Sequence, residues 1–224
     1  MASTDPRPES RIPLSRDRVL RTAMEMADEG GLATLTMRGL GQALGVEAMA
    51  LYRHVANKSD LIDAMVDLVF SEIELPVAGA DWRIEMRKRA VSVREVLSRH
   101  HWAVGVMESR RHPGPSNLRH HDAVIGCLLA GGFDMTMAAH AYSVLDSYTY
   151  GFAQTQMNLP FGAGSQDVQE TARRMLTPFP VDEYPNLVAF ITDHATNPDY
   201  DYGDEFQYGL DLILDGIARD RPRA

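Results

Sequence analysis

Two glycines four residues apart, Gly41 and Gly45, constrain the fold of this chain more than any other feature. A helix-turn-helix needs a small residue where its helices cross, and a glycine that can adopt a left-handed conformation in the turn. Within segment 36–58, TMRGLGQALGVEAMALYRHVANK, Gly41 suits the crossing and Gly45 suits the turn. The apolar residues that lock the two helices are Leu40, Leu44, Val46 and Leu51. The spacing therefore predicts a helix-turn-helix whose second helix, over 47–55, projects outward.

The remaining sequence predicts an all-α fold. Apolar residues recur at helical spacing, and no segment shows sustained period-two alternation. Ser15, Thr36 and Asn57 are suited to N-cap three of the helices, and Gly30-Gly31 is expected to end the first. The predicted helices span 16–29, 37–44, 47–55, 58–75, 82–100, 101–109, 116–130, 134–156, 166–176, 185–195 and 203–219.

The charge distribution divides the chain into a neutral N-terminal part and an acidic remainder. The net charge is −9, but residues 1–60 carry eight Lys or Arg and eight Asp or Glu, so the whole deficit lies in 61–224. We expect a flexible N-terminal arm over 1–14, because its prolines and polar residues bury little apolar surface. A three-helix helix-turn-helix head follows over 15–60. Residues 61–224 are expected to form a connecting helix and a larger helical body for ligand binding and dimerisation.

Composition excludes several classes of protein. No window holds the roughly 18 apolar residues of a membrane span, and the N-terminus lacks a secretory signal, so we expect a cytoplasmic protein with no membrane partner. The single Cys127 forms no internal disulfide, which agrees with a reducing compartment. Gly39-Leu40-Gly41 is a weak dinucleotide fingerprint, because no strand precedes it and the third glycine falls one position late.

The sequence also lacks the common catalytic motifs, which argues against an enzyme. The sequence shows no Gly-x-Ser-x-Gly, His-Glu-x-x-His or Walker motif, so we expect no catalytic residue. The adjacent pairs His100-His101 and His120-His121 point to different helix faces and form no i, i+4 clamp. We therefore expect no metal and no cofactor.

The second helix of the motif presents side chains that the apolar lock leaves free. These are Ala48, Met49, Ala50, Arg53 and His54. A DNA major groove about 12 Å wide admits such a helix, in which Met49 and Ala50 would touch thymine methyls or sugars. Tyr52 and His54 can donate to phosphate oxygens, and Lys58 stands at a helix N-terminus suited to phosphate.

The run LYRHVANKSDLIDAM, over 51–65, resembles the TetR family of bacterial transcriptional repressors. In that family the recognition helix ends with a similar Leu-Tyr-x-His run, and a lysine-led helix start follows it. The resemblance implies a DNA-binding set of Arg38, Ala48, Met49, Ala50, Tyr52, Arg53, His54 and Lys58. Arg38 matches a position that reaches a base in the tetracycline repressor. For Arg53, base recognition and phosphate neutralisation stay open alternatives.

The segments DSYTYGFAQTQ (146–156) and FQYGLDLILDGIA (206–218) resemble the C-terminal domain of the tetracycline-repressor branch. The resemblance implies a homodimer joined through these two helices, with its two heads about 34 Å apart on a pseudo-palindromic, double-stranded DNA operator. The apolar residues expected at the dimer interface are Tyr142, Phe206, Leu210, Ile213 and Ile217.

The same resemblance implies a pocket in the body for a small-molecule effector that releases the DNA. Candidate lining residues are Trp102, Met107, Tyr148 and Phe152. The basic run Arg83, Arg87, Lys88, Arg89, Arg94 and Arg99 is expected to form a solvated helix face, with contact of Arg87 or Arg94 to an anionic effector as the alternative. No histidine set matching the one that holds a metal-drug chelate is found around 104–112 or at Thr155, which puts tetracycline itself in doubt. Two rival hypotheses remain open: an enzyme, and an adaptor whose head, with a net charge of zero, has lost DNA affinity.

Overall fold

The computed structural model describes residues 13–110, 112–159, 170–171, 174, 182–197 and 199–220. In this part of the chain every regular element is a helix, as predicted. The elements are α1 (Arg16–Thr34), α2 (Met37–Leu44), α3 (Ala48–Leu51), α4 (Lys58–Glu72), α5 (Trp82–Arg99), η1 (His101–Ala103), η2 (Met107–Ser109), α6 (Pro115–Ala130), α7 (Met135–Met157), α9 (Pro185–Phe190), η3 (Ile191–Ala195) and α10 (Tyr202–Asp220). The predicted arm over 1–14 and the predicted helix over 166–176 lie outside the described residues, apart from the few positions named above.

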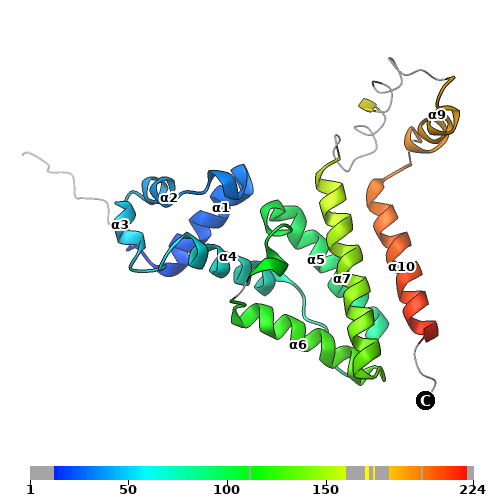
Figure 1. Cartoon of the computed structure of the whole chain (residues 1–224), viewed down its shortest axis with the longest axis horizontal. Helices are drawn as coiled ribbons and strands as arrows, with labels where there is room; N and C mark the ends of the chain where they lie inside the picture. Colours follow the sequence, from blue (N-terminus) through cyan, green and yellow to red (C-terminus); the bar gives the residue numbers. More distant parts are fainter. Residues whose placement is uncertain are drawn as a thin grey trace, which may run out of the picture.

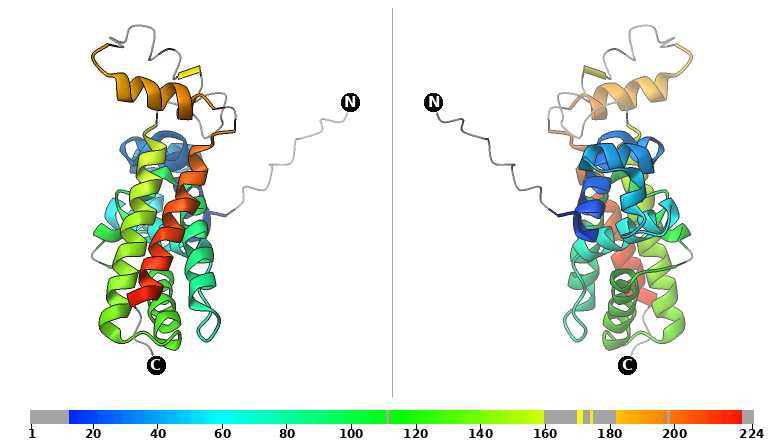
Figure 2. Two further views of the ribbon diagram at one scale, coloured as in Figure 1. Left: turned by 90° about the vertical axis from the view of Figure 1, so that its right-hand side faces the viewer. Right: turned by 90° about the vertical axis from the view of Figure 1, so that its left-hand side faces the viewer.

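The helices form a small head and a larger body. Figure 1 shows α1, α2 and α3 grouped at one end, with α4 leading from them to α5, α6, α7 and α10. Helix α6 packs on both α4 and α7, and α7 packs in turn on α5 and α10. Figure 2 shows α7 and α10 side by side on the face turned away from the head. Among the described residues, no helix is long and apolar enough to span a membrane.

Two apolar clusters hold these helices together. The first joins the head to the body, because it contains Leu40 and Leu51 of the motif together with Val93 and Leu97 of α5. The second lies wholly in the body, between α5, α6, α7 and α10. Because the first cluster crosses from head to body, the head is packed against the body as well as tethered to it.

The predicted helix starts are confirmed by their capping bonds. The side chains of Ser15, Thr36 and Asn57 each accept a hydrogen bond from the backbone N–H three residues later. The predicted stop at Gly30-Gly31 coincides with a break in the helix: Gly31 leaves the helical conformation with a φ of 73°, and one further turn reaches Thr34. Glycine tolerates this positive φ, so the chain bends and completes a last turn, in which the Thr34 hydroxyl donates to the Gly31 carbonyl.

Other predicted helices are shorter or broken. The helix expected over 47–55 is regular only in α3, and residues 52–54 form a turn that keeps both Leu51 and Val55 buried. The connecting helix ends at Glu72, because extended backbone at Ile73 returns that side chain to the core. The helix expected over 101–109 is replaced by η1 and η2, since His100 leaves the helical conformation.

A polar junction adds to the apolar contact between head and body. His100, at the end of α5, places Nδ1 2.8 Å from Asp28 of α1 and Nε2 3.2 Å from Glu72 of α4. The indole N–H of Trp102 donates to the same Asp28 oxygen at 2.7 Å, and Arg99 pairs with Glu72 at 2.9 Å. One end of the body thus contacts two helices that position the motif.

We expect Glu72→Gln to lower stability modestly, and only where the carboxylate is ionised. Burial alone would raise the pKa of Glu72, but hydrogen bonds and charge from Arg99 and His100 lower it below the ordinary value of 4.5. Stabilisation from a lowered pKa is complete above pH 4.5 and is lost as pH falls through the lowered value. At pH 7 the half-exposed pair is worth about 0.5 kcal/mol, or about 1–2 °C in Tm.

Thermal unfolding of both proteins from pH 3 to pH 7 measures this difference. Glu25→Gln is the matched control, because Glu25 is exposed on α1. This substitution removes the same charge at a position away from the junction. A wild-type advantage that is unchanged at pH 3 would show that the carboxylate does not stabilise the junction.

Candidate nucleic-acid interface and effector region

The turn between α2 and α3 depends on its two glycines. Gly45 has a φ of 69°, and its N–H bonds back to the end of α2. A Cβ on Gly41 would lie 2.9 Å from the carbonyl oxygen of Val46 and 3.2 Å from the amide nitrogen of Ala48. Only glycine fits at this backbone crossing, so the sequence prediction for both positions agrees with the structure.

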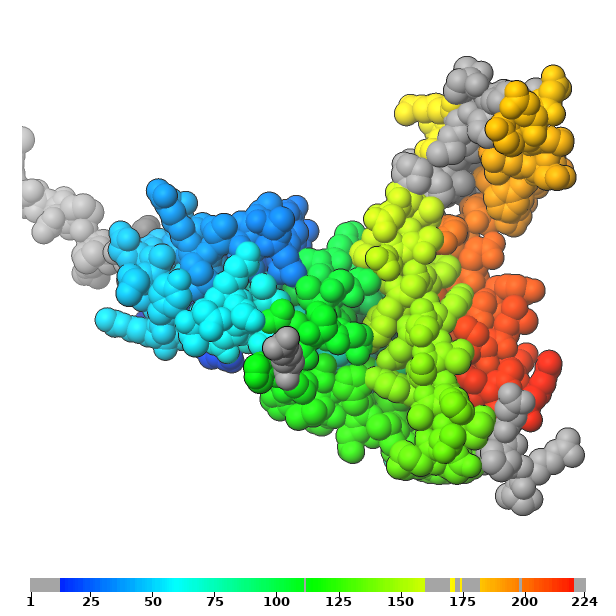
Figure 3. Space-filling model, viewed as in Figure 1, coloured from blue at the N-terminus to red at the C-terminus, as the bar shows by residue number. Residues whose placement is uncertain are grey.

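The crossing directs α3 outward. Leu40, Leu44 and Leu51 are buried beneath it, whereas the side chain of Met49 is 75% exposed. Tyr52 and Arg53 are exposed, and Ala48, Ala50 and His54 are half-buried beside them. Figure 3 shows side chains of the α2–α3 region protruding at the end of the head farthest from the body. The structure thus gathers most of the predicted DNA-binding set on one projecting surface.

Arg38 and Arg53 add positive charge to this surface. Arg38 is exposed in the first turn of α2, and Arg53 is exposed just after α3. Among the described residues, neither guanidinium group forms an ion pair or hydrogen bond within the chain. Both groups therefore retain all their donors for an external acceptor.

Lys58 differs from the other predicted contacts. It is half-buried, and its Nζ lies 3.3 Å from the carbonyl oxygen of Leu32, to which it donates. The amide of Asp60 already donates to Asn57, and the Asp60 carboxylate accepts from the Ala56 amide at 2.8 Å. Lys58 thus fastens the N-terminus of α4 to the end of α1.

Both halves of the chain match known protein families. Residues 19–65 match the family model for bacterial regulatory proteins of the tetR family, and residues 75–221 match the model for the tetracyclin repressor-like C-terminal domain. The chain belongs to the TetR family. A transcriptional regulator of Saccharopolyspora erythraea is 34% identical over 139 residues, which are 62% of this chain and 59% of that relative.

Two further TetR-family proteins match nearly the whole chain. The transcriptional repressor DrrR1 of Streptomyces coeruleorubidus is 29% identical, over 91% of this chain and 77% of that protein. Among solved structures, ActR of Streptomyces coelicolor in complex with actinorhodin has a TM-score of 0.74 and 26% identity, over 95% of this chain and 100% of that chain. Head and body of this TetR-family chain therefore both have relatives of known structure.

The candidate effector residues fall into two separate groups. Trp102 and Met107 belong to the cluster that joins head and body. Tyr148 and Phe152 pack instead on Phe206 of α10, with ring centroids 5.6 and 5.1 Å away. The four side chains are thus divided between the two apolar clusters of the molecule.

The apolar stripe predicted for the dimer interface faces inward. Phe206 and Leu210 are fully buried against their own body, and Ile213 and Ile217 pack on the same cluster. Tyr142 is engaged with His121 of α6. An apolar stripe can pack on its own chain or on a partner. In this structure the stripe of α10 packs on the body of its own chain.

The opposite face of α10 carries the exposed apolar residues that the sequence reasoning missed. Tyr208 is 67% exposed and Leu212 is 57% exposed, and the i, i+4 spacing places them on one face. A Cβ on Gly209 would meet the Tyr148 hydroxyl of the same chain, whereas Gly216 lies in open space. The i, i+4 spacing of Tyr208 and Leu212 in the sequence could have indicated this second apolar face.

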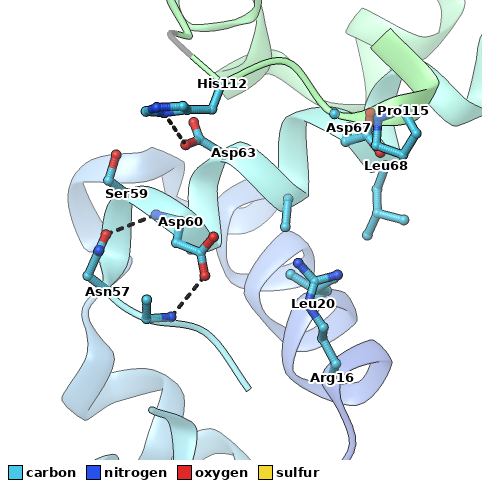
Figure 4. A pocket seen from close by; sticks show the side chains of 13 residues that line it. Arg16, Leu20, Asn57, Ser59, Asp60, Asp63, Asp67, Leu68, His112 and Pro115 are labelled. Carbon is cyan, nitrogen blue, oxygen red and sulfur yellow. Dashed lines mark hydrogen bonds and ion pairs between the residues drawn. The ribbon is translucent and has the colours of Figure 1, made fainter. Parts of the chain in front are cut away.

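A cleft of about 530 Å³ lies between α1, α4 and the segment before α6 (Figure 4). Its carboxylates already have partners: Asp63 pairs with Arg110, and Asp67 accepts from the amides of Ser116 and Asn117 at 2.8 and 3.0 Å. In the described ranges, no group of three or more His, Cys, Asp or Glu side chains is placed to hold a metal. The cleft therefore marks where α4 is fastened to the start of α6.

We expect the same substitution at two glycines to have opposite effects. Gly41→Ala forces a Cβ against backbone atoms and should destabilise the protein by about 1–3 kcal/mol. Gly126→Ala, inside α6 with open space around the new Cβ, should stabilise it by about 0.5–1 kcal/mol. Denaturant unfolding gives both values, and hydrogen exchange should place the Gly41 effect in α2 and α3. A neutral Gly41→Ala would contradict the tight crossing.

Proposed function

We propose that this TetR-family chain is a transcriptional repressor that binds a pseudo-palindromic operator as a homodimer and is released by a small-molecule effector. The projecting α3 surface, with Met49 exposed at its tip, is the observation that carries the proposal. A protein with this role acts in the cytoplasm, and we assign it no catalytic activity.

The proposed DNA contacts divide by chemistry. Ala48, Met49 and Ala50 enter the major groove, where the exposed methionine packs on thymine methyls or sugars. Tyr52 and His54 donate to phosphates, while Arg38 and Arg53 supply the free guanidinium groups able to read guanine. Lys58 supports the surface mainly by fastening α4, which revises its predicted role.

Alanine substitution of Arg38 and Arg53 tests this division. Loss of a bidentate contact to guanine should cost about 1–3 kcal/mol on the cognate operator and little on scrambled DNA. Gel shifts with the DNA upstream of the chain's own gene, at two salt concentrations, measure both losses. Arg119→Ala is the control, since Arg119 is exposed on α6 of the body. A uniform loss on all sequences would reduce both arginines to phosphate contacts.

We propose that the dimer forms through α7 and the outer face of α10. Tyr208 and Leu212 are large, apolar and exposed, and Gly216 leaves room for a close approach of a second backbone. A two-fold axis beside α10 would then carry two heads that reach successive major grooves about 34 Å apart. The inward stripe of Phe206 and Leu210 would support this surface from behind.

Charge placed on that face should separate the subunits. Tyr208→Arg with Leu212→Arg puts four like charges at the contact, so we expect a monomer at micromolar concentration and loss of operator binding. Leu118→Arg, at a similarly exposed leucine of α6, is the control and should remain dimeric. Sedimentation equilibrium decides the point, and an intact dimer of the double variant would place the interface elsewhere.

An effector is proposed because similar proteins have been solved with a bound small molecule. ActR was solved with actinorhodin, and a TetR variant of Acinetobacter baumannii with minocycline. In this chain an effector would release DNA by preferring the body conformation that holds the heads at an unsuitable separation. Helix α4 is the proposed link, since it packs on α6 and leads into the head.

A further inference from the structure

His100 lies where the body meets the head, and both of its ring nitrogens face carboxylates. The residue is 7% exposed, so water has little access to the ring. Nδ1 lies 2.8 Å from Oδ1 of Asp28 in α1, and Nε2 lies 3.2 and 3.3 Å from the two carboxylate oxygens of Glu72 in α4. The ring follows the last turn of α5, so it joins the body to a helix of the head and to the helix that leads into the head.

These two contacts require more hydrogens than a neutral imidazole carries. An ionised carboxylate only accepts hydrogen bonds, so each ring nitrogen must donate. A neutral ring has a hydrogen on one nitrogen and a lone pair on the other, and that lone pair would face a carboxylate oxygen at 2.8 or 3.2 Å. Only the imidazolium, with a hydrogen on both nitrogens, satisfies Asp28 and Glu72 together.

The charges that face the ring favour the same state. Asp28 faces it from α1 and Glu72 from α4, while Arg99 of α5 pairs with Glu72 at 2.9 Å. Burial opposes ionisation of Glu72, but hydrogen bonds and charge from Arg99 and His100 lower its pKa below 4.5. Trp102 donates to the Asp28 oxygen without adding charge. With a neutral ring the two carboxylates exceed the one guanidinium, whereas the imidazolium balances them.

We propose that His100, as an imidazolium bridging Asp28 and Glu72, is the positioning residue that holds the head in one orientation on the body, and that it makes operator binding dependent on pH. The inference rests on the proposed function, because it concerns how that operator is bound. Heads that are already held in place lose less conformational entropy when both of them bind DNA. The bridge would therefore strengthen operator binding without touching the DNA.

The direction of the pH dependence follows from the two partners. An imidazole exchanges its proton within the range of about pH 5 to 8. The contact with two carboxylates exists only in the folded protein, so the stabilisation it gives is present at the acidic end of this range and is lost as the pH rises. We therefore compare pH 6, where the bridge is expected to be formed, with pH 8.5, where it is expected to be weakened.

Thermal unfolding of full-length His100→Gln and wild type tests the bridge. We expect the Tm deficit of the variant to be about 2–4 °C larger at pH 6 than at pH 8.5. The altered packing around the glutamine is the same at both pH values, so it cancels from this difference. His101→Gln is the matched control, because His101 is the exposed neighbour of His100. A His100→Gln deficit that does not change with pH overturns the proposal.

Asp28→Asn tests the bridge from the other side, and it remains informative if His100→Gln fails to fold. The new amide oxygen can still accept from Trp102 but offers no charge to His100. We expect its Tm deficit, like that of His100→Gln, to be larger at pH 6 than at pH 8.5. Glu29→Gln, at the next and exposed position of α1, is the control. Equal deficits of Asp28→Asn at the two pH values would contradict an imidazolium at His100.

Operator binding separates this inference from the proposed function. The ratio of wild-type to His100→Gln affinity should be at least about threefold larger at pH 6 than at pH 8.5. His54, a proposed phosphate contact, is present in both proteins, so its own titration cancels. If the wild type binds no operator at either pH, the proposed function fails, while the Tm values still decide the bridge. If operator binds and the ratio is the same at both pH values, the positioning role fails and the proposed function stands.

Discussion

The attachment of α4 to both halves of the molecule is the constraint on which the rest of the structure depends. At its start, Lys58 is fastened to the end of α1, and along its length Asp67 caps the first turn of α6. At its end, Glu72 meets His100 and Arg99 of α5. With the apolar cluster that crosses the same boundary, these contacts leave little freedom for the head to move while the body stays still.

Features that arise locally could be predicted from the sequence. Ser15, Thr36 and Asn57 act on amides three residues away, so their capping roles require no knowledge of the tertiary fold. Gly41 and Gly45 belong to the same class, because the helix crossing and the turn are built within one short segment. The break at His100 is different, since that residue leaves the helix where its ring contacts Asp28 of α1 and Glu72 of α4.

The candidate sites show the same division. The projecting side chains of α3 follow from the motif itself, whereas Phe206 and Leu210 identify a buried face without saying which chain buries it. Spacing alone also could not separate the Trp102 group from the Tyr148 group, which lie in different apolar clusters. Arg89 was missed although a signal existed: it falls on the buried stripe of α5 with Met86 and Val93. A basic residue on such a stripe requires buried partners, and His120 and Asp146 provide them.

The distribution of charge gives the molecule a preferred direction of approach. All of the net charge of −9 resides in residues 61–224, while the first sixty residues are balanced. The net charge of the body therefore disfavours its approach to a polyanionic duplex, whereas the end that carries Arg38 and Arg53 is not repelled in this way. Collisions in the wrong orientation are discouraged before any contact forms. Repulsion between the acidic body and DNA thus favours encounters in which the head approaches the duplex first.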